Sequence, residues 1–215
     1  MSTPLVITEI FHSIQGESSF MGLPCVFVRL TGCPLRCRWC DTDYAFQGGT
    51  RMTLDEVLAK VATYGCQLVE VTGGEPLAQR ASLDLMRALA DAGYTVLLET
   101  SGALPIEEVD PRVHRIVDLK CPDSAEASRN RLENLAHLTP RDEVKFVVAS
   151  RTDYEWARGM VKQHELEGKA RLLFSPVHGE LEPATLAAWV LADRLVARFQ
   201  LQMHKYIWSP DARGV

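Results

Sequence analysis

Short runs of valine, isoleucine and leucine recur along the chain, and helical patterns separate most of them. The runs cover residues 6–11, 26–30, 68–72, 95–99, 116–119, 144–148, 171–174 and 199–203. They are continuous rather than regularly alternating with polar residues, which is typical of strands buried on both faces of a parallel sheet. We therefore predict seven or eight strands, mostly parallel.

Between the runs, helices are predicted over 53–63, 82–92, 153–167 and 183–197, and a further one over 124–138. Thr53 and Glu56 have capping-box spacing, and Gly93 stands where a left-handed residue ends a helix. Strands alternating with helices form right-handed βα units. A complete eight-stranded barrel typically needs about 250 residues. The 215 residues therefore predict an α/β fold that is a partial, open (β/α) barrel with a mostly parallel sheet.

Polar and small residues gather where six of the predicted strands end. These segments are 72–76, 99–102, 118–122, 150, 175–179 and 202–205. Barrels and open α/β sheets place their active sites at the carboxyl ends of parallel strands. Turn formation is the better explanation of any one segment, but the six together favour a functional site.

The composition, 47% hydrophobic and 24% charged over 215 residues, predicts one soluble domain spanning 1–215. The net charge of −5 argues against nucleic acid bound through a broad basic face. No apolar run approaches the ~20 residues of a membrane span. The first residues lack the pattern of a secretory signal, so we expect a cytoplasmic location. In that compartment the six cysteines are expected to be ligands or reactive thiols rather than disulfides.

Three of the six cysteines fall within eight residues, directly after the 26–30 run. Cys33, Cys37 and Cys40 can converge on one metal centre from a single loop. Structural zinc needs a fourth ligand nearby, and none is evident. A [4Fe–4S] cluster normally takes four cysteines, so three leave one iron open to another ligand. The remaining cysteines, 25, 66 and 121, are expected to be passive thiols.

The cysteine spacing, with Trp39 just before the last cysteine, resembles the signature of radical S-adenosylmethionine (SAM) enzymes. Residues 73–76, Gly-Gly-Glu-Pro, resemble that family's motif for the methionine part of SAM. The resemblance implies a [4Fe–4S] cluster whose open iron chelates SAM. It also implies a 5′-deoxyadenosyl radical that abstracts hydrogen from a substrate, and a barrel of the radical SAM type.

Further segments resemble the 7-carboxy-7-deazaguanine synthases, a radical SAM family of queuosine biosynthesis. They are residues 13–17, 27–33, 40–42, 72–77, 99–102 and 202–208. This resemblance implies conversion of 6-carboxy-5,6,7,8-tetrahydropterin to 7-carboxy-7-deazaguanine with loss of ammonia, with SAM regenerated and Mg²⁺ required.

The same resemblance assigns roles to individual residues. Cys33, Cys37 and Cys40 would hold the cluster, and Thr42 would contact Mg²⁺. Contacts with SAM are expected from Trp39, Gly74, Glu75, Ser101 and Lys120. Contacts with the substrate are expected from Ile14, Gln15, Gly16, Arg29 and Thr72, and Gln15 and Glu17 suit the donor–acceptor edge of a pterin. Arg29 suits the substrate carboxylate because a guanidinium binds a carboxylate through two hydrogen bonds.

Two other functions share parts of this pattern. A glycyl-radical-enzyme activating enzyme has similar cysteine spacing but acts on a protein, and a non-catalytic iron–sulfur or zinc module also remains open. As partners we expect an electron donor such as flavodoxin. A second copy of the chain is also expected, because open sheet edges need covering. The histidines 12, 178 and 204 are expected to be structural.

Overall fold

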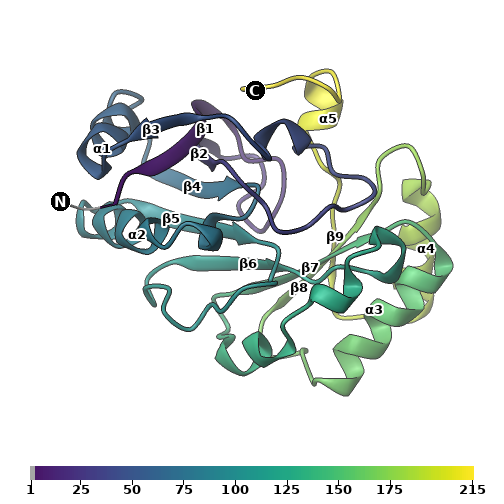
Figure 1. Cartoon of the computed structure of the whole chain (residues 1–215). Coiled ribbons are helices and arrows are strands. Elements are labelled where there is room, and N and C mark those ends of the chain that lie inside the picture. Colours follow the sequence, from purple (N-terminus) through teal and green to yellow (C-terminus); the bar gives the residue numbers. More distant parts are fainter. Residues whose placement is uncertain (1–2) are drawn as a thin grey trace.

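The computed structural model describes residues 3–215, whose strands form one nine-stranded sheet in the order β3-β1-β2-β4-β5-β6-β7-β8-β9 (Figure 1). Neighbours from β2 to β9 are parallel, whereas β1 is antiparallel to both β2 and β3. The sheet ends at β3 and β9, so the predicted open, mostly parallel (β/α) barrel is confirmed. The strands are β1 (Leu5–Ile14), β2 (Pro24–Leu30), β3 (Thr50–Met52), β4 (Leu68–Gly73), β5 (Thr95–Thr100), β6 (His114–Asp118), β7 (Glu143–Val148), β8 (Arg171–Pro176) and β9 (Arg198–Phe199).

The first and last parts of the sheet differ from the prediction. The parallel arrangement was wrong for β1, because the short connection to β2 contains no helix, and a parallel crossover needs a dozen or more residues. Strand β3 was not predicted. The strand expected over 199–203 was also wrong beyond Phe199, since Met203 donates its N–H to the carbonyl of Gly16 instead of extending β9.

Four of the five predicted helices are present, with ends shifted by several residues in some cases. They are α1 (Leu54–Ala62), α2 (Ala81–Asp91), α3 (Arg151–Gln163) and α4 (Pro183–Ala192), and a short α5 (His204–Ile207) follows β9. The capping box of Thr53 and Glu56 is confirmed, as is the left-handed Gly93 at φ 89°.

The helix predicted over 124–138 was wrong. That region contains three short 3-10 helices, η3 (Pro122–Ser124), η4 (Ala127–Arg129) and η5 (Leu132–His137). Ala125 adopts a left-handed φ of 66° and Asn130 an extended conformation, so no α-helix continues through either residue. Two further 3-10 turns, η1 (Asp43–Ala45) and η2 (Pro76–Ala78), follow the cysteine segment and β4.

The parallel strands have two unlike faces. Side chains such as Val71, Leu98 and Phe146 join those of α1–α4 in the main apolar core, and Figure 1 shows these helices outside the sheet. The opposite, inner face carries a smaller apolar cluster that includes Phe27, Leu68, Leu97, Ile116 and Leu173. Two residues further along each of four strands, this face turns polar, at Arg29, Glu70, Glu99 and Asp118. The inner face therefore has an apolar floor beneath a polar cavity.

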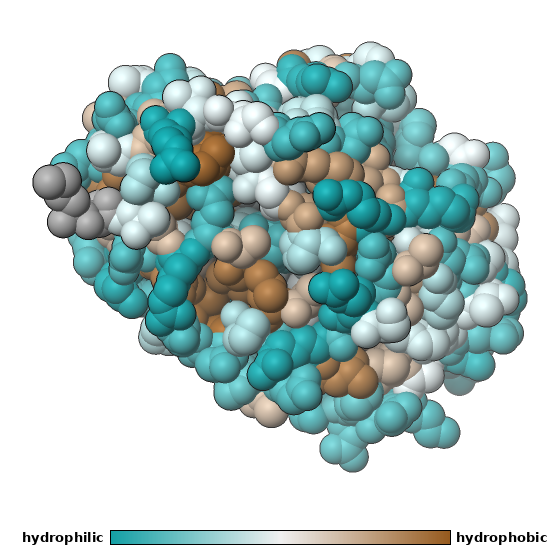
Figure 2. All heavy atoms as spheres, viewed as in Figure 1, coloured by the Kyte–Doolittle hydropathy of each residue, from teal (hydrophilic) through white to brown (hydrophobic). Residues whose placement is uncertain are grey.

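The outer surface is mainly hydrophilic on the face that Figure 2 shows, where apolar residues form small separate groups. Within residues 3–215, no helix has the length and apolar character needed to cross a membrane.

Candidate active site

A polar cavity of about 560 Å³ opens at the carboxyl ends of the parallel strands. The polar strand ends singled out in the sequence therefore do meet. Of the residues predicted to form the site, the cavity is lined by Ile14, Gln15, Gly16, Arg29, Cys33, Trp39, Cys40, Thr42, Thr72, Gly74 and Ser101.

Three predicted site residues do not line the cavity: Cys37, Glu75 and Lys120. The Glu75 carboxylate is fully buried, and accepts hydrogen bonds from the Thr100 hydroxyl at 2.9 Å and the Ser101 N–H at 2.8 Å. It thus joins the end of β4 to the end of β5. Lys120 pairs with Asp118 at 2.8 Å.

The cysteine loop (residues 33–40) is held in place by contacts with the region after β6. The Arg38 N–H donates to the carbonyl of Ser124 at 3.1 Å, and the loop turns over the buried Leu35. Burial raises the pKa of the Cys37 thiol to about 11, while Lys120 acts in the opposite direction. Cys33, Cys37 and Cys40 are free thiols. Within residues 3–215, no group of His, Cys, Asp or Glu side chains is arranged to hold a single metal ion.

The Gly-Gly-Glu-Pro loop (residues 73–76) packs directly against the cysteine loop. The Glu75 N–H donates to the carbonyl of Gly32 at 2.8 Å. A Cβ on Gly74 would overlap that carbonyl and lie 2.9 Å from Cβ of Cys33. Only glycine allows this approach. The cradle it leaves beside three free cysteines fits a cluster with an open iron and a ligand such as SAM.

The deep part of the cavity contains a buried cation that the sequence reasoning missed. Lys145 of β7 has a side chain only 5% exposed, and its Nζ lies 3.0 Å from Glu17, 3.6 Å from Asp118 and in contact with Glu99. Although burial favours the neutral acid, Lys145 and then His204 hold the pKa of Glu17 below its usual range. A lysine inside the apolar run 144–148 was the signal that could have revealed this network.

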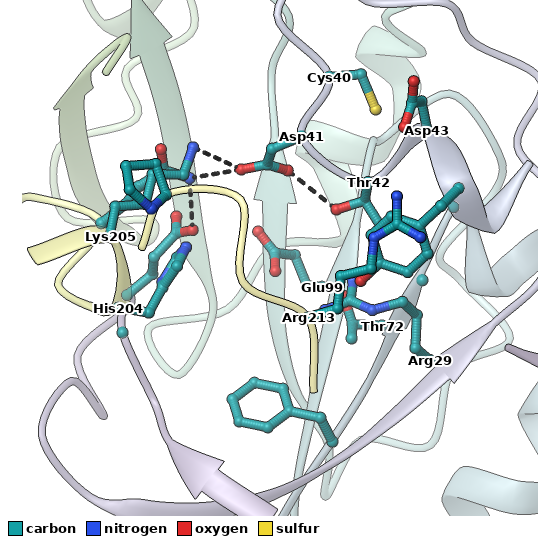
Figure 3. A pocket seen from close by; sticks show the side chains of 18 of the residues that line it. Arg29, Cys40, Asp41, Thr42, Asp43, Thr72, Glu99, His204, Lys205 and Arg213 are labelled. Atoms are coloured by element: carbon teal, nitrogen blue, oxygen red, sulfur yellow. Dashed lines mark hydrogen bonds and ion pairs between the residues drawn. The ribbon is translucent and has the colours of Figure 1, made fainter. Parts of the chain in front are cut away.

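The mouth of the cavity carries a second group of charges. Arg29 donates its Nε to Glu9 at 2.8 Å, and the Tyr44 hydroxyl donates to the same carboxylate oxygen at 2.8 Å. The Arg213 guanidinium lies 4.2 Å from the centre of the Tyr44 ring. Figure 3 shows Arg29 and Arg213 on the same side of the cavity. Sequence reasoning missed Glu9, Tyr44 and Arg213.

Asp41 links the cysteine loop to the C-terminal helix. Its carboxylate lies 2.7 Å from Nζ of Lys205 and accepts a hydrogen bond from the Thr42 hydroxyl at 2.9 Å, as Figure 3 shows. Since the Thr42 hydroxyl donates its hydrogen bond to Asp41, its oxygen lone pairs are available to a cation at the cavity wall.

This arrangement of an open parallel barrel, three cysteines in one loop and a packed Gly-Gly-Glu-Pro loop defines a radical SAM enzyme, and the family model described as "Radical SAM superfamily" matches residues 27–119. A 7-carboxy-7-deazaguanine synthase of Chlorobaculum tepidum is 55% identical over 220 residues, covering 100% of both chains. One of Koribacter versatilis is 50% identical, covering 97% of this chain and 99% of the relative. The chain therefore belongs to the family of 7-carboxy-7-deazaguanine synthases.

A solved structure supports the fold. The crystal structure of QueE from Escherichia coli matches with a TM-score of 0.78 at 23% identity, covering 94% of this chain and 95% of that one.

Proposed function

We propose that the protein converts 6-carboxy-5,6,7,8-tetrahydropterin to 7-carboxy-7-deazaguanine with loss of ammonia, as the radical SAM lyase of queuosine biosynthesis. The observation that carries this proposal is the packing of the cysteine loop on the Gly-Gly-Glu-Pro loop beside a polar cavity containing Arg29. Relatives that match the whole chain bear the same activity in their names.

In this proposal Cys33, Cys37 and Cys40 hold the [4Fe–4S] cluster. Trp39, Gly74 and Ser101 contact SAM from the cavity wall. Glu75, which accepts the N–H of Ser101, and Lys120, which pairs with Asp118, are the remaining SAM residues of this proposal. When bound, the cluster and SAM supply a carbon-centred radical that removes hydrogen from C6 of the substrate.

The substrate occupies the polar inner face. The Nε of Arg29 donates to Glu9. Within residues 3–215 no hydrogen bond uses the two Nη groups of Arg29, so both are free to bind a substrate carboxylate. Ile14, Gln15, Gly16 and Thr72 line the same cavity. Lys145 contacts both Glu17 and Glu99, and these carboxylates can accept hydrogen bonds from ring N–H groups.

Thr42 is proposed to contact Mg²⁺, with substrate oxygens and water completing the shell. Thr42→Ala is expected to retain the cluster but to require at least tenfold more Mg²⁺ for half-maximal turnover, because one ligand is lost. Thr42→Ser keeps the hydroxyl and should behave as wild type. Magnesium titrations of anaerobic turnover measure both variants. An unchanged Mg²⁺ requirement in Thr42→Ala would remove Thr42 from the site.

The functional test is an anaerobic assay with 6-carboxytetrahydropterin, SAM, Mg²⁺ and a reductant. We expect 7-carboxy-7-deazaguanine only when all components are present. Tight binding of a protein substrate without turnover of the carboxypterin would instead indicate a glycyl-radical-enzyme activating enzyme, which the family membership does not favour. A protein that binds neither iron nor SAM would indicate a non-catalytic module.

We also propose that the chain is one domain and that it works in the cytoplasm as a homodimer. Its electrons would come from an acidic carrier such as flavodoxin. The exposed Leu191 and Val196 near the edge strand β9 support pairing with a second copy. The exposed Arg36 and Arg38 within the cysteine loop support docking of an acidic donor. A monomer in light scattering would overturn the dimer.

A further inference from the structure

Glu70 is a buried acid in the middle of β4, and neither the cluster nor SAM accounts for it. Its flanking residues Val69 and Val71 point into the main core, whereas Glu70 lies on the inner face and lines the cavity. It is only 2% exposed. Burying a carboxyl group costs free energy unless it is well bonded, so such a residue in an apolar strand indicates a functional constraint.

The contact of Glu70 is with a predicted substrate residue. Gln15 donates its side-chain Nε2 to the Glu70 carboxyl group, and its Oε1 accepts the N–H of Glu17 at 2.8 Å. These two hydrogen bonds fix the positions of the amide nitrogen and the amide oxygen of Gln15. Each bond uses one site of the amide, so one Nε2 hydrogen and one Oε1 lone pair stay available, and this pair suits the adjacent acceptor and donor of a lactam edge, as on a pterin ring.

The groups around Glu70 set its charge. It faces Arg29 and the Cys25 thiol on β2, Glu99 on β5, Lys145 on β7 and Glu17 before β2. Burial first, and then Glu99 and Glu17, raise the pKa of Glu70 well above its ordinary value, against the opposing effect of Lys145 and Arg29. The contacts of Lys145 are with Glu17, Glu99 and Asp118, so Glu70 is the carboxyl group of this cluster that has no ion pair with the lysine.

We propose that Glu70 is a positioning and specificity residue, a neutral carboxylic acid that fixes the Gln15 amide so that its free donor and acceptor recognise the lactam edge of the substrate. This inference rests on the proposed function, and it adds a residue and a protonation state to it. An ionised Glu70 would put a third negative charge beside Glu17 and Glu99, and would disturb the recognition of the substrate.

The test compares Glu70→Leu and Glu70→Gln by substrate affinity and by the pH dependence of KM. Glu70→Leu frees the Gln15 amide, so KM and the equilibrium Kd for the carboxypterin should rise about tenfold, the effect of one lost hydrogen bond. The Kd for SAM should not change. Glu70→Gln keeps an acceptor for Gln15 and should retain the wild-type KM at pH 7. In wild type KM should rise at alkaline pH as Glu70 loses its proton, and in Glu70→Gln this rise should disappear.

Thermal unfolding separates positioning from a structural role. Glu70→Leu removes the cost of burying a carboxyl group but leaves the Gln15 amide without its acceptor, so the unfolding midpoint should stay close to that of wild type. As a matched control, Glu143→Gln alters another buried carboxyl group, at the amino end of β7 and outside the cavity. There Glu143 accepts the N–H of Ser19 at 3.1 Å. It should lower stability without changing KM.

An unchanged KM in Glu70→Leu, or the same alkaline rise in Glu70→Gln, would overturn the inference while leaving the proposed function in place. A wild-type protein that neither binds nor converts the carboxypterin would refute the proposed function itself.

Discussion

Replacement of Cys37 by alanine is expected to abolish both the iron–sulfur cluster and all turnover. Three cysteines are already one fewer than a [4Fe–4S] cluster normally takes, so two cannot be expected to retain it. Cys37 is half-buried in a loop held by backbone hydrogen bonds. No other cysteine can take its place, because Cys25 and Cys121 are buried and Cys66 lies before the amino end of β4. The loss of turnover should exceed a thousandfold.

Iron content, the EPR spectrum of the reduced protein and anaerobic turnover measure this effect. Cys66→Ala is the matched control, because Cys66 is a thiol outside the cavity and its Sγ lies 3.3 Å from the carbonyl of Pro24. It should keep the cluster and its activity. A Cys37→Ala protein that still contains four irons and produces 7-carboxy-7-deazaguanine would contradict the assignment of the cluster ligands.

Lys145→Met should cause the second largest effect, on stability as well as on activity. The substitution leaves Glu17, Glu99 and Asp118 around an apolar side chain where a buried cation stood. Removing one partner of a buried ion pair typically costs about 3–5 kcal/mol. Chemical denaturation should show a loss of this order at pH 7, whereas Lys162→Met, an exposed position on α3, should change stability by less than about 0.5 kcal/mol.

The pH dependence of this loss gives a sharper test. In wild type the folded-state pKa of Glu17 lies below its usual, unfolded-state value. The stabilising contribution of ionised Glu17 is therefore complete above the unfolded-state pKa and is lost as the pH falls through the folded-state pKa. Without Lys145, burial makes protonated Glu17 the favoured form. The stability difference between wild type and Lys145→Met should therefore shrink as the pH is lowered from 7 towards 4. A difference that stays constant would show that Lys145 acts through packing rather than through charge.

The motifs at strand ends were predictable because they are local. Cys33–Cys40 and Gly73–Pro76 each follow a strand of the parallel sheet, and the carboxyl ends of such strands meet at one edge. Residues far apart in sequence were therefore placed together without knowledge of the packing. The alternation of most strands and helices along the chain was predictable for the same reason, since each βα unit is defined within about thirty residues.

Residues inside the strands could not be placed in the same way. The runs containing Glu70 and Lys145 look continuously apolar, because one face packs on the helices and half of the other forms the apolar floor. Only the direction of each side chain separates the buried core from the cavity. The antiparallel β1 and the contacts of Tyr44 with Glu9 and Arg213 depend on long-range packing, which leaves no periodic signal in the sequence.

The central claim is that this cavity converts a carboxypterin to a deazaguanine by radical chemistry, and one quantitative assay tests it most directly. The reconstituted protein is incubated anaerobically with excess 6-carboxytetrahydropterin, reductant, Mg²⁺ and a known amount of SAM. Product, ammonia and 5′-deoxyadenosine are then measured together. We predict 7-carboxy-7-deazaguanine and ammonia in equal amounts, well above the SAM consumed. A protein that cleaves SAM to 5′-deoxyadenosine while the carboxypterin remains unchanged would contradict the account.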